Sequence, residues 1–395
     1  MAAIQIRNLD VIFGDRIIES AALLDQGLSR QEIIDATGDV VGVHNANLDI
    51  EQGEICVLMG LSGSGKSSLL RAVNGLNPVS RGQLKVCDGD KMVDLANCDE
   101  KTLRHLRSNR ISMVFQKFAL MPWLTVIDNV AFGLEVMGMA KTERRQKALE
   151  QLELVGLAEW KDNYPHELSG GMQQRVGLAR AFAMDSDILL MDEPFSALDP
   201  LIRHQLQDEL ILLQKKLNKT ILFVSHDLDE ALKIGSRIAI MESARIIQCG
   251  PPEDIVLKPA NAYVENFVAH TNPLNVLGGH TLMTPVSDLE HKDGRCLADQ
   301  AQQLWLTIED GQVIRAEKNG AASVPLQACS MDDEQLPTSG NVAVIDANVS
   351  MRRAIELSYS TEMPVLLTEN GQFAGVLTQQ NFYHALLGKH FTSAA

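Results

Sequence analysis

A glycine-rich run near residue 60 constrains the fold of this chain more than any other feature of its sequence. The run Gly60-Leu61-Ser62-Gly63-Ser64-Gly65-Lys66-Ser67, continued by Ser68, follows an apolar stretch and opens a helical pattern. Glycines let successive backbone N–H groups turn inward toward an anion, and a helix start adds its positive dipole end. The pattern predicts a phosphate loop in which Lys66 contacts the β- and γ-phosphates and Ser67 ligates Mg²⁺. A chance glycine-rich turn is the alternative, and the flanking strand and helix disfavour it.

Short apolar runs indicate a layered α/β core around this loop. Residues 188–191 and 220–224 have the pattern of fully buried parallel strands, and a helical pattern at 201–217 separates them. Residues 4–13 alternate loosely and predict an edge-type strand. Other segments predict strands at 43–50 and 54–59, a short helix opened by a Ser29–Glu32 capping box and ended before Gly38, and a helix from Thr142.

Two adjacent carboxylates follow the buried strand at 188–191. The carboxyl ends of parallel strands are where α/β sheets bind ligands. Asp192 is therefore placed to hold the magnesium shell, and Glu193 to polarise or position an attacking water. An acidic strand-to-loop junction without function is the alternative, and the upstream phosphate loop makes it less credible.

A second glycine-rich helix start lies at 168–175. Ser169 has the character of an N-cap, and Gly170 and Gly171 expose backbone N–H groups before Gln173. The chain thus has two helix N-termini that are suited to bind phosphate, but one lysine-bearing loop. A symmetric pair, in which the second loop of each copy closes on the nucleotide of the other, explains this economically. A purely structural capped helix is an equal alternative on spacing alone.

Three single residues extend the candidate site. Gln116 follows a short strand and is a candidate contact for magnesium and water, with an ordinary surface glutamine as its alternative. His226 ends the buried strand at 220–224 and faces the expected phosphate edge, although a histidine there more often caps or packs. Phe13 is a candidate for stacking on an adenine ring, and by itself is more often a core aromatic.

Composition excludes several classes of protein. The formal net charge of −16 disfavours a nucleic-acid binder. No apolar run reaches the roughly 18 residues of a membrane span, and no export signal opens the chain. Six scattered cysteines without a C-x-x-C pair argue against zinc sites and a disulfide framework.

The dense motifs end near Asn272-Pro273, where we place a domain boundary. In the tail, Asp310-Gly311 and Asn370-Gly371 lie 60 residues apart in similar surroundings and predict hairpins. Two copies of a roughly 60-residue unit suggest a pseudo-symmetric module, and two unrelated hairpins are the alternative.

In their order along the chain, these motifs resemble the ATPase subunit of an ABC transporter over roughly residues 1–260. The resemblance implies an ABC-type phosphate-loop core with a parallel sheet, an antiparallel β subdomain and a helical subdomain at about 99–175. It assigns Glu193 as the catalytic carboxylate, His226 as the switch histidine, Gln116 as the Q-loop residue, and Ser169 and Gly171 as contacts to the γ-phosphate bound by a partner copy. It also implies a D-loop at Ser196, Ala197, Leu198 and Asp199.

A narrower resemblance concerns cargo. The insertion at about 15–42, the phosphate loop and the 200–210 segment look like importers of quaternary amines, and the front end most resembles the ATP-binding subunit of choline uptake systems. The resemblance implies ATP and Mg²⁺ as ligands, a second copy of the chain and a membrane permease as partners, and indirectly an extracytoplasmic binding protein. It places the chain at the cytoplasmic face of a bacterial inner membrane.

The tail at 273–395 resembles a pair of cystathionine-β-synthase-type (CBS) regulatory modules, with a degenerate first copy and a second at about 340–390. Some betaine importers use such modules to sense ionic strength at an anionic membrane, which requires basic surface. Residues 274–395 carry 7 Lys/Arg against 14 Asp/Glu, a balance of −7 that disfavours this role. A purely structural tail is the alternative.

Two other classes of function remain open from sequence. An ABC ATPase of DNA repair or translation would share the motifs, but the coiled-coil or zinc insertions of such proteins are not evident. A phosphate-loop kinase would use Asp192 or Glu193 on a small hydroxyl, and the Leu168–Gln174 loop counts against it. Within the resemblance, two further alternatives are an ABC importer of another cargo and a nucleotide-sensing module in which the C-terminal repeat binds adenosine ligands and hydrolysis is vestigial.

Overall fold

The computed structural model describes residues 2–116, 119–196, 198–269, 276–292, 294–319, 322–331, 333 and 335–386. The chain divides into two compact units, Met1–Pro252 and Glu253–Ala395. Because this division falls after Pro252, it precedes the boundary predicted at Asn272-Pro273, which itself lies outside the described residues. Within the part of the chain that the structure describes, no helix is both long enough and apolar enough to span a bilayer.

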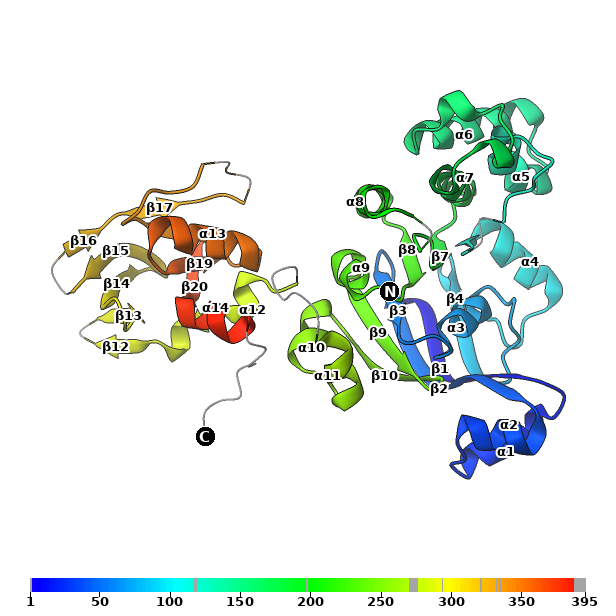
Figure 1. Ribbon diagram of the computed structural model, residues 1–395, viewed down its shortest axis with the longest axis horizontal. Coiled ribbons are helices and arrows are strands. Elements are labelled where there is room, and N and C mark those ends of the chain that lie inside the picture. The colour runs from blue at the N-terminus through cyan, green and yellow to red at the C-terminus, as the bar shows by residue number, and fades with distance from the viewer. Residues whose placement is uncertain are drawn as a thin grey trace. The chain divides into compact units, whose positions relative to one another are not determined.

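A six-stranded sheet forms the centre of the first unit (Figure 1). Its strands run in the order β10-β9-β3-β8-β7-β6, with β10 antiparallel and the other five parallel. Their bounds are β3 Ile55–Met59, β6 Ile111–Val114, β7 Ile188–Asp192, β8 Thr220–Val224, β9 Arg237–Glu242 and β10 Arg245–Gly250. Every residue of β3, β7 and β8 is buried. The predicted buried parallel strands and α/β class are thus confirmed.

The helices that connect these strands lie on the same sheet. They are α3 Lys66–Val73, α4 Glu100–Asn109, α8 Pro200–Leu217 and α9 Leu228–Ile234. Helix α3 buries Leu69 and Leu70 completely, in one apolar core with Leu58 and Leu190. This core fixes the helix that follows the glycine-rich run against the strands on either side of it.

A second, four-stranded antiparallel sheet covers the same core. Its order is β2-β1-β4-β5, with β1 Ala2–Phe13, β2 Val40–Glu51, β4 Arg81–Asp88 and β5 Lys91–Asp94. The prediction of an edge-type strand at 4–13 is wrong, because β1 pairs with β2 on one side and β4 on the other. The β4 partner lies about 70 residues away, so the local alternation could not reveal it.

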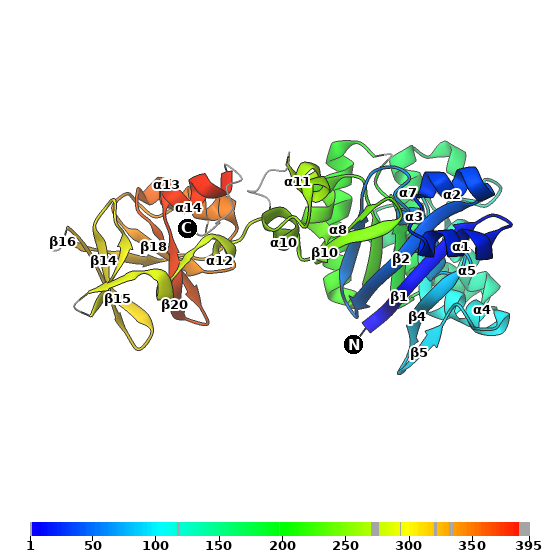
Figure 2. The same cartoon turned by 90° about the horizontal axis from the view of Figure 1, so that it is seen from below.

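A helical hairpin joins β1 to β2 (Figure 2). Helices α1 (Ile17–Asp25) and α2 (Arg30–Thr37) occupy the predicted insertion at 15–42. The predicted capping box is confirmed, since Ser29 and Glu32 cap each other's backbone N–H groups and α2 ends at the left-handed Gly38.

Three further helices form a separate apolar layer. They are α5 Val126–Val136, α6 Lys141–Leu154 and α7 Gly170–Ala183, with 3₁₀ turns η1 Ala158–Trp160 and η2 Pro165–Glu167 between α6 and α7. Ala148, Leu152 and Val155 are buried in this layer with Leu149 packed against them, as their helical spacing predicted. The predicted helical region at about 99–175 is interrupted by β6, which belongs to the six-stranded sheet.

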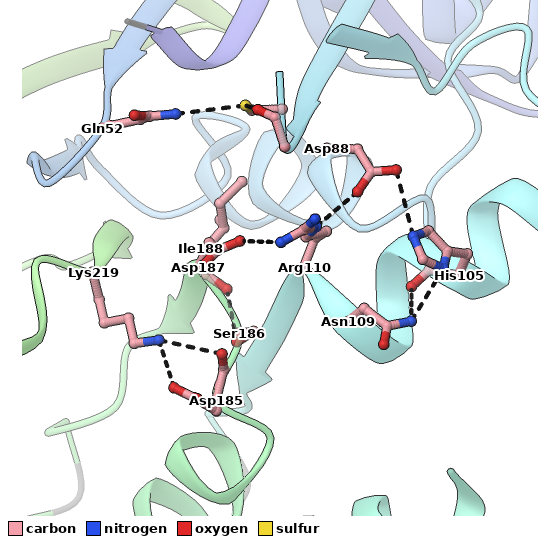
Figure 3. A network of polar contacts seen from close by, with 12 residues as sticks. Gln52, Asp88, His105, Asn109, Arg110, Asp185, Ser186, Asp187, Ile188 and Lys219 are labelled. Carbon is pink, nitrogen blue, oxygen red and sulfur yellow. Dashed lines mark hydrogen bonds and ion pairs between the residues drawn. The ribbon is translucent and has the colours of Figure 1, made fainter. Parts of the chain in front are cut away.

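Polar contacts join the two sheets at the end of β4. Arg110, between α4 and β6, donates from Nε to Asp88 Oδ1 at 2.7 Å and from Nη1 to Asp187 Oδ2 at 2.8 Å. Figure 3 shows the Arg110 guanidinium between these carboxylates, with His105 on the other oxygen of Asp88 at 3.4 Å. The hydrogen bond from Arg110 holds the pKa of Asp88 below its usual value. The antiparallel sheet is thereby tied to the segment that precedes β7.

The second unit begins with helices α10 (Pro252–Leu257) and α11 (Ala262–Val268) and contains two sheets. One sheet has the order β11-β20-β19-β18-β17. Its elements are α12 Gly279–Leu282, β11 Thr284–Pro285, β17 Leu326–Ala328, β18 Val342–Asp346, α13 Met351–Thr361, β19 Val365–Glu369, β20 Gln372–Leu377 and α14 Gln379–Leu386. The other is an antiparallel meander of β12 Glu290–Lys292, β13 Arg295–Asp299, β14 Leu304–Glu309, β15 Gln312–Lys318 and β16 Ala322–Val324, preceded by the turn η4 Val286–Asp288.

Both predicted hairpin turns are present in this unit. Asp310-Gly311 joins β14 to β15 and Asn370-Gly371 joins β19 to β20, each with positive φ at both residues. The backbone N–H of Phe373 donates to Gly311 O at 2.8 Å, so the two turns are adjacent. The β18-α13-β19-β20-α14 unit carries helices, whereas the described residues between 290 and 324 form strands without a helix. Among the described residues of the tail, the similarity of the two segments is confined to the hairpins, and the pair of CBS-type modules stays a prediction.

The Arg110 contacts generate a stability prediction. We expect Arg110→Ala to lower the free energy of unfolding by about 1 kcal/mol, because the partly buried Asp88 and the exposed Asp187 lose their shared cation. Arg104→Ala, which removes an exposed pair with Glu100 on the same helix, is the control and should cost less than about 0.5 kcal/mol. Urea denaturation measures both, and equal effects would contradict a joining role for Arg110.

Candidate nucleotide site

The loop between β3 and α3 has the backbone of an anion-binding turn. Gly60 and Gly65 have φ of 141° and 105°, in the left-handed region. A Cβ on Gly60 would lie 2.1 Å from Met241 O, and one on Gly65 would lie 2.2 Å from Gly42 O. Glycine is therefore required at both positions for conformation and for space. The backbone N–H of Ser64 donates to Leu61 O at 3.2 Å, and the loop leads directly into the positive end of α3, which favours an anion.

Lys66 lies folded over this loop and is nearly buried. Its Nζ donates to Gly60 O at 2.8 Å and to Leu61 O at 3.0 Å. Burial lowers the pKa of Lys66 below its usual value, and the charges of Glu193 and Asp192 act in the opposite direction. An anionic ligand at the loop would add to the stabilisation of the ammonium form.

A polar cavity of about 620 Å³ opens over the loop. Its walls come from the loop, from the β1–β2 region and from the ends of β6, β7 and β8. The lining residues are Phe13, Arg30, Val40, Gly42, Ser62, Gly63, Gly65, Lys66, Ser67, Ser68, Gln116, Glu193 and His226. Residues from seven separate stretches of sequence thus meet at one cavity, including Phe13, Gln116 and His226, the three isolated residues that the sequence predicted for the site.

The end of β7 fixes both carboxylates. Asp192 is buried, and its two oxygens accept hydrogen bonds from Ser67 Oγ at 2.7 Å and from Arg71 Nη2 at 2.9 Å. Arg71 was not foreseen from sequence. Arg71 lies four residues after Ser67 on α3, which places both on one helix face. This spacing is the feature of the sequence that could have indicated Arg71.

Glu193 projects into the cavity from a strained backbone. Its φ is 47°, unusual for a residue other than glycine. Its Oε2 accepts a hydrogen bond from Gln116 Nε2 at 3.0 Å and lies 3.2 Å from His226 Nδ1. The structure therefore brings together three residues that are far apart in sequence and were proposed independently. The Gln116 amide and the His226 imidazole both contact the same oxygen of the Glu193 carboxylate. A carboxylate held in this way is suited to accept a proton from a bound water.

Phe13 lies at the β1–β2 side of the cavity. Its side chain is 36% exposed, and a Cβ on Gly42 would lie 2.5 Å from its ring. An exposed ring at the wall of the cavity fits stacking on a base better than core packing.

The second glycine-rich loop lies elsewhere. Ser169 caps α7, with its Oγ accepting from Met172 N at 3.4 Å, and Gln173 donates its side chain to Leu168 O. None of the residues Ser169, Gly170, Gly171 and Gln173 lines the cavity over the phosphate loop. Gly171 instead faces Leu198 and Ile202, since a Cβ there would lie within 4 Å of both side chains.

The segment after Glu193 connects the two regions. Ser196 Oγ donates to Glu193 O at 3.0 Å, and Asp199 caps α8 by accepting from Ile202 N at 3.1 Å. Leu198 is buried beside Gly171. Ala197, also proposed for this loop, lies outside the described residues.

Glu230 is a further buried carboxylate beside the site. Asp227 caps α9 by accepting from the backbone N–H of Glu230, but the Glu230 side chain does not return to that cap. It accepts hydrogen bonds from Ser225 Oγ and from Gln207 Nε2 at 3.0 Å. Burial raises the pKa of Glu230 above its usual value. Ser225 directly follows β8 and Gln207 lies in α8, so the local capping pattern could not predict these partners.

The comparisons with known proteins agree with this geometry. A family model described as "ABC transporter" matches residues 43–196. The glycine betaine/proline betaine transport ATP-binding protein of Escherichia coli is 42% identical over 97% of each chain. The choline transport ATP-binding protein of Bacillus subtilis is 41% identical over 58% of this chain and 59% of its own. A dimeric, post-hydrolysis ATP-binding cassette bound to ADP and Pi superposes with a TM-score of 0.53 at 29% identity, covering 63% of this chain and 98% of that one.

The Glu230 environment predicts a pH dependence of stability. Because the pKa of Glu230 is raised in the folded state, its contribution to stability is present below the unfolded pKa and is lost as pH rises through the folded value. Glu230→Gln removes this titration. The stability of the variant relative to the native chain should therefore be greater at pH 8 than at pH 5. Urea denaturation at the two pH values measures this, and a difference that does not change with pH would contradict it.

Proposed function

Because the chain belongs to the ATP-binding subunits of ABC transporters that import glycine betaine, choline and related osmoprotectants, we propose that its cavity over the phosphate loop is half of an ATP site completed by a second copy. The observation that carries the proposal is the separation of two phosphate-seeking elements. The cavity holds Lys66 and Glu193, whereas the Ser169 loop lies outside it. The protein is an ATPase that drives transport, and the roles below are proposed for its residues.

The bound triphosphate would lie along the loop at the start of α3. Residues Gly60, Leu61, Ser62, Gly63, Ser64 and Gly65 turn backbone N–H groups to it, with Ser67 and Ser68 at the first turn of the helix. Lys66, now bonded to Gly60 and Leu61 carbonyls, neutralises the β- and γ-phosphates. Phe13 stacks on the adenine ring.

The donors beside the loop fit Mg²⁺. The Ser67 hydroxyl and the buried Asp192 carboxylate are 2.7 Å apart, and the Gln116 amide lines the same cavity. These are hard oxygen ligands of the kind that Mg²⁺ prefers. Mg²⁺, when bound with ATP, supplies charge neutralisation at the phosphates, and Ser67, Asp192 and Gln116 would hold it.

Glu193 is the proposed catalytic carboxylate. Its Oε2, approached by Gln116 and His226, is the atom placed to accept a proton from the attacking water. His226 orients this carboxylate and responds to the γ-phosphate. The positive φ of Glu193 holds the side chain in the cavity rather than along the strand.

Two copies would close head to tail. The Ser169, Gly170 and Gly171 loop of each copy addresses the γ-phosphate on the other, with Gln173 in the following helical turn. Ser196, Leu198 and Asp199 link this loop to Glu193. ATP gives both loops a shared anionic partner, so it favours the closed pair, and hydrolysis removes that differential stabilisation.

The permease subunit would dock beside the helical layer. A groove of about 370 Å³ there is lined mainly by apolar side chains of β6, α5, α7 and the 115–121 segment, Phe115, Met121, Phe132 and Met184 among them. Trp123 is 73% exposed nearby in the chain. Leu120, three residues before Trp123, packs on the helical layer, and Phe118 lies outside the described residues.

The cargo is a quaternary amine such as choline or glycine betaine, recognised by an extracytoplasmic binding protein and carried by the permease at the inner membrane. The relatives support this class of cargo. The full-length match to a glycine betaine/proline betaine system includes the tail, whereas the match to a choline system covers 58% of the chain. Transport assays of the reconstituted complex with choline, glycine betaine and carnitine distinguish the cargoes.

Replacement of the catalytic carboxylate tests the site. We expect Glu193→Gln to bind MgATP with native affinity, because the Lys66 ammonium at the phosphate loop is kept. ATP turnover should fall by about 10²–10⁴-fold, because the proton acceptor is lost. An ATP-dependent dimer should accumulate, measured by size-exclusion chromatography with light scattering. Turnover at the native rate would show that Glu193 is not the catalytic carboxylate.

Removal of Trp123 tests the docking surface. Trp123→Ala should abolish co-purification with the permease and leave thermal stability unchanged. The indole is exposed, so its removal takes contacts away from the interface with the permease and not from the core of the subunit. Trp160→Ala, at a second tryptophan that is 40% exposed in η1, is the matched control and should co-purify normally. Equal recovery of permease with both variants would rule out docking at Trp123.

A further inference from the structure

The inserted α1–α2 hairpin contributes a side chain to the nucleotide cavity. Arg30 is the first residue of α2, and its Nη1 donates to the carbonyl of Gly63 in the phosphate loop at 2.8 Å. Arg30 also lines the cavity itself. An element inserted between β1 and β2 thus reaches the loop that follows β3.

The hairpin is fixed to the core, so the position of Arg30 is determined. Asp39 accepts hydrogen bonds from Ser20 Oγ at 2.7 Å and from the backbone N–H of Arg16 at 3.3 Å. Ile33, three residues after Arg30, is fully buried in a small core with Ile12 and Val41. On the other helix, Asp25 pairs with Arg81 at 2.7 Å. These contacts hold both helices against β1 and β2.

The Arg30 guanidinium has N–H donors that are not used by the bond to Gly63. A guanidinium carries five N–H groups, and one carbonyl cannot use them. Arg30 Nε is buried without a hydrogen-bond partner in the described part of the chain, and none of the described carboxylates forms an ion pair with Arg30. Arg175, Arg203 and Arg353 also have a buried Nε without a partner, but Arg30 alone of the four lines the cavity over the phosphate loop. Because buried donors without partners are costly, its guanidinium is available to an anion in that cavity.

We propose that Arg30 binds the phosphate chain of the nucleotide, as a second cation beside Lys66. The proposal rests on the nucleotide site described above. Phosphate is favoured over the base because Gly63 belongs to the loop that surrounds the phosphates, and because the guanidinium fork matches phosphate oxygens. The bond to Gly63 O keeps the fork at this position before the nucleotide arrives. The insertion is thereby part of the ATP site.

Titration of the full chain with MgATP, MgADP and adenosine tests the proposal. Arg30→Ala should weaken MgATP and MgADP binding by about tenfold or more, because a charge-assisted contact is lost, and leave adenosine binding unchanged. Arg30→Lys, which keeps the charge without the fork, should fall between Arg30→Ala and the native chain. Isothermal titration calorimetry measures the nucleotides, and saturation-transfer NMR measures adenosine.

Arg16→Ala is the matched control. It removes the same charge from the same hairpin, where Arg16 bonds Glu19 and Ala36 O and does not line the cavity. Native-like nucleotide affinity of Arg30→Ala would overturn the proposal, and so would an equal loss in Arg16→Ala or a parallel loss of adenosine binding. If the native chain itself bound no MgATP, the nucleotide site would be wrong. If the native chain bound MgATP and Lys66→Ala abolished that binding, native-like MgATP affinity of Arg30→Ala would refute the proposed role of Arg30 and leave the nucleotide site intact.

Discussion

The architecture of the site depends on the buried carboxylate of Asp192. A buried charge is tolerated only when it is paired and hydrogen-bonded, and Ser67 and Arg71 of α3 supply both partners. These contacts lock the helix that follows the phosphate loop onto the strand that precedes Glu193. The phosphate loop and the Glu193 carboxylate therefore keep one relative position, although about 130 residues separate them.

Much of this arrangement could be predicted from sequence because its signals are local. The phosphate loop, the buried strand before Asp192 and the Ser29 cap each occupy fewer than ten residues, and each has a characteristic pattern. The ends of parallel strands then bring Gln116, Glu193 and His226 to one edge of the sheet, which topology alone implies. The hairpin turns of the tail were predictable for the same reason, since two residues specify each turn.

The features that sequence did not reveal depend on long-range contacts. Strand β1 resembles an edge strand until its pairing with β4 is seen. Arg30 and Arg71 have no motif, and only the fold places them against Gly63 and Asp192. In the tail, the similarity of two turns suggested a repeat, but β14 and β15 continue into a meander whereas β19 and β20 are flanked by helices.

In the proposed pair, one ATP is held by the Lys66 loop of one copy and the Ser169 loop of the other. Mixing two inactive variants tests it most directly, because Lys66→Ala and Ser169→Arg damage different halves of a shared site. In a head-to-tail pair of one Lys66→Ala chain and one Ser169→Arg chain, both defects fall in the same site and the second site is intact. Each variant alone should have no ATPase activity, and the mixture should regain it. A mixture that stays as inactive as its components would show that the two loops act within one chain, and would contradict the account.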